Sequence, residues 1–405
     1  MTPTILVLNA GSSSIKFQVF AVSGGAGLAR RIKGQMEGIG SRPRLLARNA
    51  DGKVLVDQTW SQADASSVPA ALDKVIAFLR ATIGALPTAI GHRVVHGGPH
   101  YSEPTKITAT ALTELERLSP LAPLHQPHNV GLIRSIWERQ PQLLQVACFD
   151  TAFHRGHAEV ADRYAIPEAL YAEGVRRYGF HGLSYEYIAR HLEEIAPDLA
   201  KGRVVVAHLG SGASMCAIRA GKSVESTMGF TALDGLPMGT RPGQIDPGIV
   251  LYLIDQKGMS TAEVQRFFYH DCGLKALSGI SNDVRELDAS SDPKAGFALD
   301  CFAYRVGLNA GMLAAALDGV DGFVFTAGIG ENSPSMRARI ARRLAWLGIE
   351  LDPSANTAGG PLISRSDSRV TVYVVPTDEE LMIARHTLAL LSGAGAQRLK
   401  TARTA

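Results

Sequence analysis

The chain has 405 residues, enough for two or three domains at about 150 residues each, and 46% of them are hydrophobic, enough to build a large core. Its net charge is only +3, from 41 basic and 38 acidic residues scattered along the chain, which argues against a nucleic-acid or membrane-surface partner. No segment combines low hydrophobicity with high charge, so the composition predicts a folded protein.

In chain order, apolar runs alternate with segments of helical pattern. The sequence predicts a strand at 5–8, antiparallel hairpins within 28–60, helices at 67–83 and 110–119, a strand at 145–149, a helix at 183–195, a strand at 204–209, helices at 261–269 and 294–317, a strand at 322–326, a helix at 335–347, a strand at 370–375 and a helix at 378–391. This alternation predicts an α/β protein with a largely parallel sheet.

Nothing in the sequence predicts export or membrane insertion. The first residues, MTPTILVLNAGSSSIKF, lack the basic stretch of an export signal, and the apolar segment 306–329 is interrupted by Asp318 and Asp321. The four cysteines are widely spaced and contain no CxxC pair, which is typical of reduced thiols. We therefore expect a cytoplasmic protein with no membrane partner.

Two segments half a chain apart share one layout. Residues 5–17 (ILVLNAGSSSIKF) and 204–218 (VVVAHLGSGASMCAI) each place an apolar strand, a turn of small residues and a second strand in succession. This internal repeat indicates that one α/β unit is duplicated.

The turn at 9–14 (NAGSSS) can present backbone N–H groups to an anion, with Lys16 adding a positive charge. An ordinary polar turn is the alternative, and the phosphate-binding pattern GxxxxGK[ST] is absent. At 91–98 (GHRVVHGG), Arg93 could present its planar fork to a carboxylate or phosphate, or could be a surface arginine beside structural histidines. Because no Glu follows His92, a zinc-binding helix is not favoured there.

Ten of the twelve histidines lie between residues 92 and 208, beside the segments 149–154 (FDTAFH) and 176–182 (RRYGFHG), which favours an active site in this part of the chain. Asp150 directly follows a predicted strand, a common position for functional carboxylates in α/β sheets. The segment 327–332 (AGIGEN) also follows a strand, and its GxG is a weak signal for a nucleotide site. The first strand is not followed by GxGxxG, which argues against a dinucleotide-binding dehydrogenase.

Taken together, these segments resemble the acetate kinase family, within the acetate and sugar kinase, Hsc70 and actin superfamily. The resemblance runs from Leu6 to about Arg385 through VLNAGSSSIKF, GHRVVHGG, APLH, FDTAFH, YGFHG, HLGSGAS, MGTRPGQIDPG, TAGIGENS and PTDEELMIA. It implies two duplicated ribonuclease-H-like domains of the actin-like ATPase type around a central cleft, and a homodimer. The first domain would be 1–150, completed by a C-terminal helix at about 382–405, and the nucleotide-binding domain would be 151–381.

The activity that the resemblance implies is reversible transfer of the ATP γ-phosphoryl group to acetate, with Mg²⁺ or Mn²⁺. The implied catalytic residues are Asp150, His181 and Arg241. The implied substrate-binding residues are Arg93, Val94, Leu124, His125, Phe180 and Ala232, and the metal would be held by Asn9 and Glu379. The nucleotide would be bound by Lys16, His208, Leu209, Gly210, Ser211, Gly212, Asp283, Val284, Arg285, Gly328, Ile329, Gly330, Glu331 and Asn332.

The chain departs from the usual family pattern at several positions near these residues: Gln126, Tyr185, Ser211, Ala232, Pro242 and Asp378. Asp378 creates a run of three acids, so Glu380 could replace Glu379 at the metal. At Ala232 the family usually has Pro, and a smaller side chain would enlarge the acyl pocket, so we expect acetate to be preferred and propionate to be used appreciably.

The role of Asp150 follows from the substrate. A carboxylate acceptor is already ionised near pH 7, so we expect Asp150 to orient an arginine or Mg²⁺ and to abstract no proton. Three alternatives stay open from the sequence: a propionate or butyrate kinase, a relative that uses pyrophosphate as donor, and a non-catalytic nucleotide-binding protein of the actin or Hsc70 type.

Overall fold

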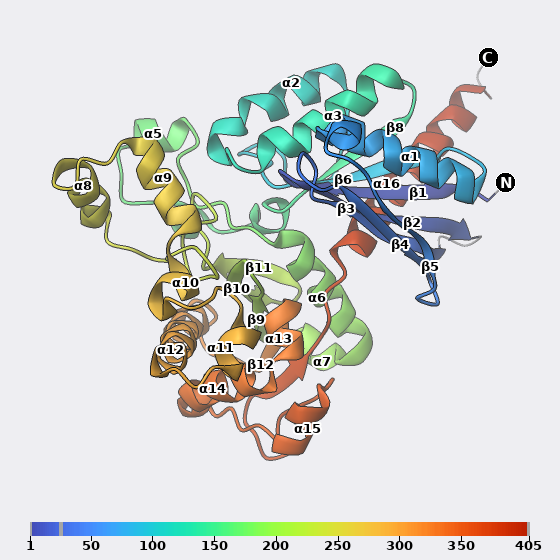
Figure 1. The fold of residues 1–405 in the computed structure, drawn as a ribbon. Coiled ribbons are helices and arrows are strands. Elements are labelled where there is room, and N and C mark those ends of the chain that lie inside the picture. Colours follow the sequence, from blue (N-terminus) through green and yellow to red (C-terminus); the bar gives the residue numbers. More distant parts are fainter. Residues whose placement is uncertain (1, 24–26, 403–405) are drawn as a thin grey trace. The chain divides into compact units, whose positions relative to one another are not determined.

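The structure is a computed structural model that describes residues 2–23 and 27–402, with side chains up to residue 393. It divides into two compact units, Met1–Ala152 with Asp378–Ala405, and Phe153–Thr377. Each unit is built on one mixed sheet with helices packed on it (Figure 1). The expected C-terminal helix is α16, Glu379–Ala402, and residues 403–405 of that prediction lie outside the described residues.

Unit 1 contains an eight-stranded sheet in the order β5-β4-β3-β2-β1-β6-β8-β7. Its strands are β1 (Thr4–Ala10), β2 (Ser14–Ser23), β3 (Gly27–Glu37), β4 (Arg44–Asn49), β5 (Val54–Thr59), β6 (Ala89–Val94), β7 (Thr105–Lys106) and β8 (Leu144–Phe149). Strands β1 to β5 form the antiparallel meander that the hairpin signals predicted, whereas β6 is parallel to β1 and to β8.

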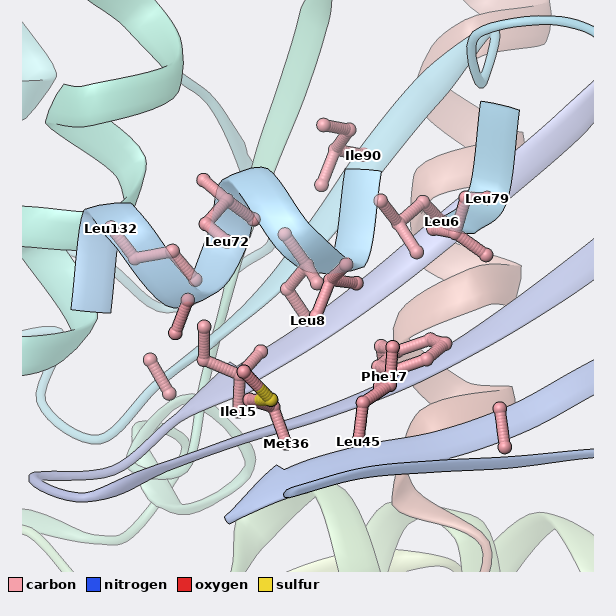
Figure 2. Close-up of a cluster of buried hydrophobic side chains, with 14 of the residues drawn as sticks. Leu6, Leu8, Ile15, Phe17, Met36, Leu45, Leu72, Leu79, Ile90 and Leu132 are labelled. Carbon is pink, nitrogen blue, oxygen red and sulfur yellow. The ribbon is translucent and has the colours of Figure 1, made fainter. Parts of the chain in front are cut away.

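One face of this sheet is covered by α1 (Val68–Ile83) and α3 (Gln126–Arg139). Figure 2 shows Leu6, Leu8 and Phe17 of the sheet packed with Leu72 of α1 and Leu132 of α3. Each such buried side chain contributes about 1.5–3 kcal/mol. Beside this cluster, α2 (Ala109–Arg117) and α3 pack on β6 and β8.

The opposite face of unit 1 is covered by α16, which packs on β1, β6 and β8. The approach is so close that a methyl group at Gly91 would lie 2.4 Å from Oγ1 of Thr387 and 2.5 Å from Cγ2 of Ile383. Only glycine fits at this position, so α16 is seated directly on β6, the strand that carries Arg93.

Unit 2 contains a five-stranded sheet in the order β11-β10-β9-β12-β13. Its strands are β9 (Arg203–Leu209), β10 (Ala213–Arg219), β11 (Lys222–Ser226), β12 (Gly322–Thr326) and β13 (Thr371–Val374). Its helices are α4 (Glu159–Asp162), α5 (Glu168–Ala172), α6 (Gly182–Ile195), α7 (Pro197–Ala200), α8 (Pro247–Asp255), α9 (Thr261–His270), α10 (Gly273–Ser278), α11 (Val284–Ala289), α12 (Pro293–Ala316), α13 (Ala327–Asn332), α14 (Pro334–Leu344) and α15 (Pro353–Ala358). Helix α6 packs its buried residues, such as Ile188 and Leu192, against β9, β10 and β12.

The two sheets share one topology. In unit 1 the strands β3-β2-β1-β6-β8 have the same order and orientation as β11-β10-β9-β12-β13 in unit 2. In each sheet three strands form an antiparallel meander, and two further strands lie beside its first strand, β1 or β9, and run parallel to it. The predicted duplication and the α/β fold class are therefore confirmed. The expectation of a largely parallel sheet is wrong, because both sheets are mixed and most strand pairs of the larger one are antiparallel. No helix in the described part of the chain has the length and apolar character needed to span a bilayer.

The structure differs from the predicted elements in several places. Residues 327–332, for which the sequence predicts no helix, form the short helix α13, which the chain enters through a positive φ of 64° at Ala327. The helix expected at 335–347 ends at Leu344 and continues as a 3₁₀ turn before Gly348. Several helices were not predicted: the short helices α4, α5, α7, α10, α11 and α15, and the longer helices α3 and α8. Helix α3 was missed because it buries polar side chains, and α8 because it is apolar and buries none.

Candidate active site

The first part of the site in unit 1 is the β1–β2 hairpin. Asn9 and Lys16 are direct cross-strand partners on its two arms, and the turn closes with a 2.8 Å bond from the Gly11 N–H to the Ser14 carbonyl. The Asn129 amide, on α3, donates to the Ala10 carbonyl at 2.7 Å. The hairpin predicted to contact phosphate is thus fixed from behind by a buried side chain.

Arg93 lies at the end of β6, and Asp150 directly follows the neighbouring strand β8. The guanidinium and the carboxylate form a bidentate pair, with Nε to Oδ1 at 3.0 Å and Nη2 to Oδ2 at 2.6 Å. Although burial disfavours its charge, the carboxylates of Asp150 and Glu379 raise the pKa of Arg93. Asp150 therefore sets the orientation of Arg93 and leaves the remaining N–H groups of the fork available to a ligand.

Glu379 begins α16 and brings a second carboxylate to Arg93, with Oε2 3.7 Å from Nε. Burial raises the pKa of the Glu379 carboxyl to about 7. The positive charge of Arg93 lowers this pKa, whereas the negative charge of Asp150 raises it further. Glu380 instead lines a neighbouring hollow of about 480 Å³ beside Lys16 and Arg30. Of the two acids considered for the metal, Glu379 is the one that joins the Arg93–Asp150 pair.

The loop after Arg93 is held by two residues that the sequence analysis did not place in the site. The buried Gln126 side chain accepts from the His96 N–H at 3.1 Å and donates to the His96 carbonyl at 3.0 Å, and Asn129 accepts from the Val95 N–H at 3.1 Å. Buried amide side chains need hydrogen-bond partners, and these two find them in the backbone of this loop. His125 occupies the position just before α3.

In unit 2, His181 precedes α6 and has a positive φ of 58°. A left-handed conformation at a residue other than glycine costs about 1–3 kcal/mol and clusters at functional sites. The preceding Phe180 carbonyl accepts a hydrogen bond from Nε2 of the fully buried His154 at 3.0 Å, which holds this backbone in place. The His181 ring stacks on His208 with centroids 4.1 Å apart and an angle of 14°.

Gly212 marks the point at which two of the predicted catalytic residues meet. A methyl group there would lie 3.0 Å from Nη2 of Arg241 and 3.3 Å from Nε2 of His181. Arg241 also donates from Nη1 to the Ala232 carbonyl at 2.8 Å, and burial lowers its pKa. Within the described residues it forms no ion pair, so its charge is available to an anion at this point.

Next to Gly212 is a cavity of about 420 Å³, a volume typical of small-molecule sites. It is lined by Gly210, Ser211, Asn282, Asp283, Val284, Arg285, Gly328, Ile329, Asn332 and Ser333. Eight of the residues predicted to bind the nucleotide are therefore brought together. The other six do not line it: Lys16, His208, Leu209, Gly212, Gly330 and Glu331. Glu331 instead accepts the N–H groups of Ala327 and Thr377 at 2.8 and 3.1 Å and fixes α13.

A buried arginine that the sequence analysis did not identify supports the cavity. Arg337 of α14 is 1% exposed and donates from Nη1 to the carbonyls of Gly330 and Glu331, each at 2.9 Å. Its other donors reach the Asn356 side chain and carbonyl at 2.7 and 2.5 Å. Arg337 therefore satisfies the carbonyl end of α13, whose first residues line the cavity.

The residues expected around the acyl group belong to both units. Val94, Leu124 and His125 are in unit 1, and Phe180 and Ala232 are in unit 2. Val94 and Phe180 are buried, with 0% and 2% exposure.

The donors of unit 1 suit a magnesium ion. The Asn9 amide and the Glu379 carboxylate offer the oxygen ligands that Mg²⁺ prefers, and a buried carboxyl with a raised pKa gains from a nearby cation. Among the described residues no group of three or more His, Cys, Asp or Glu side chains could hold a metal. That is compatible with Mg²⁺, which commonly takes one or two protein ligands together with substrate phosphates and water.

Comparison with known proteins agrees with this geometry. The sequence profile of the Acetokinase family matches residues 4–385. The acetate kinase of Nitrobacter hamburgensis is 65% identical over 388 residues, which cover 96% of each chain. Among solved structures, Porphyromonas gingivalis acetate kinase is 35% identical with a TM-score of 0.85, over 96% of this chain and 100% of that one. A propionate kinase from Francisella tularensis is also 35% identical, with a TM-score of 0.88 over 95% and 99% of the two chains.

Proposed function

Because the chain belongs to the acetokinase family, we propose that it is an acetate kinase, which transfers the γ-phosphoryl group of ATP to acetate and forms acetyl phosphate and ADP. The observation that carries this proposal is the 65% identity to an acetate kinase over 96% of the chain. In the reaction an acetate oxygen attacks the γ-phosphorus and the bond from that phosphorus to the ADP oxygen breaks. The acceptor is already ionised, so no proton has to be removed.

We infer that Arg93 binds the acetate carboxylate. Asp150 occupies Nε–H and one N–H of Nη2, which leaves both N–H groups of Nη1 for the substrate. A guanidinium held by a bidentate pair keeps one orientation, so binding loses less entropy than with a mobile arginine. In this role Asp150 positions Arg93 and removes no proton.

His181 and Arg241 would contact the phosphoryl group in transfer. Their Nε2 and Nη2 atoms converge on Gly212, which adjoins the cavity proposed for ATP. Negative charge spreads over the phosphoryl oxygens in the transition state, so donors already in position there stabilise it strongly. Removal of one such donor costs about 10²–10³ in kcat.

We propose Asn9 and Glu379 as the protein ligands of Mg²⁺, or of Mn²⁺ in its place. When bound, the ion neutralises charge on the phosphate oxygens of ATP. Lys16, the cross-strand partner of Asn9, would add its charge beside these oxygens.

We further propose that units 1 and 2 are the two domains of this fold and that two chains form a homodimer. A row of apolar side chains on α12, each at least 46% exposed, is the surface proposed for pairing: Phe297, Tyr304, Leu308 and Met312, with Trp346 beside them. We call it the α12 patch. Exposed apolar patches of this kind mark protein interfaces, and Leu308→Glu should convert the dimer into monomers in sedimentation analysis. A wild-type monomer would contradict the proposal.

The acceptor range depends on Ala232. A methyl side chain where the family usually has a proline ring leaves room for propionate. Discrimination by one methylene is small, because it changes the activation free energy that corresponds to kcat/KM by only about 1–3 kcal/mol. We propose that acetate is preferred and propionate is used, and that Ala232→Pro reduces the use of propionate relative to acetate. A ratio of kcat/KM for acetate over propionate above about 10³ in the wild type would refute the enlarged pocket.

The decisive experiment traps the acyl phosphate with hydroxylamine. Wild type and Arg241→Ala are incubated with acetate, propionate or butyrate and with MgATP or pyrophosphate as donor. We expect acetyl hydroxamate from the wild type with MgATP and at least a 10²-fold loss in the variant. Absence of product with every acid, from wild type that still binds ATP, would instead favour a non-catalytic nucleotide-binding protein.

A further inference from the structure

The buried Ser214 lies between His181 and Tyr185 in unit 2. Its Oγ is 2.8 Å from Nδ1 of His181 and 2.5 Å from the hydroxyl of Tyr185. Ser214 is on β10 and Tyr185 on α6, and both are 0% exposed. Within the described residues these are the two hydrogen-bond partners of Ser214, so its single proton must be donated to one of them.

The acidities of the three groups decide the direction of this chain. A phenol, with a pKa near 10, is a stronger acid than a serine hydroxyl, and an imidazole nitrogen is a better acceptor than a phenol oxygen. Tyr185 therefore donates to Ser214, and Ser214 donates to Nδ1 of His181. Because a neutral imidazole carries one proton, that proton must then be on Nε2.

We propose that Ser214 and Tyr185 are positioning residues that hold His181 as the neutral Nε2–H tautomer, so that His181 acts as a hydrogen-bond donor to the phosphoryl group. Nε2 is the atom that approaches the Gly212 position at 3.3 Å, beside Nη2 of Arg241 at 3.0 Å. Arg241 supplies the charge and His181 a directed N–H, and His181 neither gains nor loses a proton during transfer. This inference rests on the proposed function.

The tautomer can be read directly in the wild-type protein. Long-range ¹H–¹⁵N correlation spectra of protein labelled with ¹⁵N-histidine distinguish a protonated from an unprotonated ring nitrogen, and the His181 signals are assigned by their loss in His181→Gln. We expect Nδ1 unprotonated and Nε2 protonated near pH 7.5. A proton on Nδ1, whether in the other tautomer or in a doubly protonated ring, would overturn the proposal even if every variant failed to fold.

Kinetics test the functional consequence. Ser214→Ala should lower kcat by about tenfold or more with little change in either KM, because a donor to the transition state loses its orientation. Tyr185→Phe should have a smaller effect, since Ser214 still donates to Nδ1. His181→Gln, whose amide N–H can replace Nε2–H, should be more active than His181→Ala, and Ser214→Ala should cost less than about twofold in the His181→Gln background.

Two buried hydroxyls outside the site supply matched controls. Ser226→Ala removes a buried hydroxyl without a partner on β11, and Tyr178→Phe removes a buried phenol that donates to the Gly174 carbonyl. Both should keep the wild-type kcat. An equal loss from Ser214→Ala in the two His181 backgrounds would refute the tautomer role and leave a structural one. Failure of the wild type to form acetyl hydroxamate would refute the proposed function, independently of the tautomer that the spectra show.

Discussion

Replacement of Arg337 by methionine is expected to loosen the nucleotide cavity without touching any residue that lines it. The side chain is 1% exposed and makes four N–H···O bonds, to Gly330, Glu331 and both oxygens of Asn356. Hydrogen bonds to a charged group contribute about 1.5–3 kcal/mol each, but burial of the guanidinium cancels much of that sum. The carbonyls of α13 would be left buried without donors, so we expect a net loss of about 3–5 kcal/mol.

Calorimetry of the full chain measures this loss. At about 2–4 °C per kcal/mol for a unit of this size, the transition of unit 2 should fall by about 10 °C. The KM for ATP should rise, because α13 no longer holds Gly328 and Ile329 at the cavity wall, while the KM for acetate stays nearly constant. Saturating ATP should recover part of the lost Tm, since a ligand stabilises the state that binds it.

The control for this experiment lies on the same helix. Arg339 of α14 pairs with Asp300 at 2.6 Å, with the Asp300 side chain 58% exposed. An exposed ion pair is worth about 0–1 kcal/mol, so Arg339→Met should leave Tm and both KM values nearly unchanged. If Arg337→Met behaved like Arg339→Met, the hydrogen bonds of Arg337 would not support α13 and the reasoning would be refuted.

Gly212→Ala should lower kcat by about 10²-fold with little change in Tm, because its methyl group would displace the ends of Arg241 and His181; a kcat within twofold of wild type would exclude their convergence. Asp150→Asn should lower kcat/KM for acetate by about 10²-fold or more, since an amide cannot hold Arg93 as a charged bidentate pair, and near-full activity would contradict this role. Burial lowers the pKa of His154 from 6.5 to about 4, so its contribution to stability is complete above pH 6.5 and is lost as the pH falls towards 4. The Tm should therefore fall more steeply between pH 7 and pH 5 in wild type than in His154→Gln, and parallel profiles would argue against a buried neutral His154.

Much of the fold could be predicted because its elements are long or strongly apolar. The strands at 145–149 and 322–326 and the helix expected at 294–317 agree with β8, β12 and α12 to within a residue or so. Helix α3 was missed because Gln126 and Asn129 are buried on it, which breaks the apolar periodicity. Those two amides are buried because they bind the loop after Arg93, so the same contacts that support the site conceal the helix.

The site could be predicted only where a residue type itself carries the chemistry. Arg93 lies at the end of one strand and Asp150 follows the neighbouring strand, and the structure pairs them. By contrast, nothing in the local sequence distinguishes Arg337 from the other arginines of its amphipathic helix. Its burial follows from the packing of α14 against α15. The hydrogen bonds of Ser214 join β10 to α6, and Ser214 and Tyr185 are 29 residues apart in the sequence. A contact between residues so far apart cannot be predicted from the local sequence pattern.

Unit 1 is made of two separate stretches of the chain, and this affects how it can fold during synthesis. Its sheet is made from residues before Ala152, but the helix that covers one face of that sheet begins at Glu379. The whole of Phe153–Thr377 is translated between these two parts, so unit 2 can fold while the apolar surface of β1, β6 and β8 still faces solvent or a chaperone. Glu379 arrives with the covering helix, and the acidic half of the unit 1 site is therefore completed only when nearly all of the chain has left the ribosome.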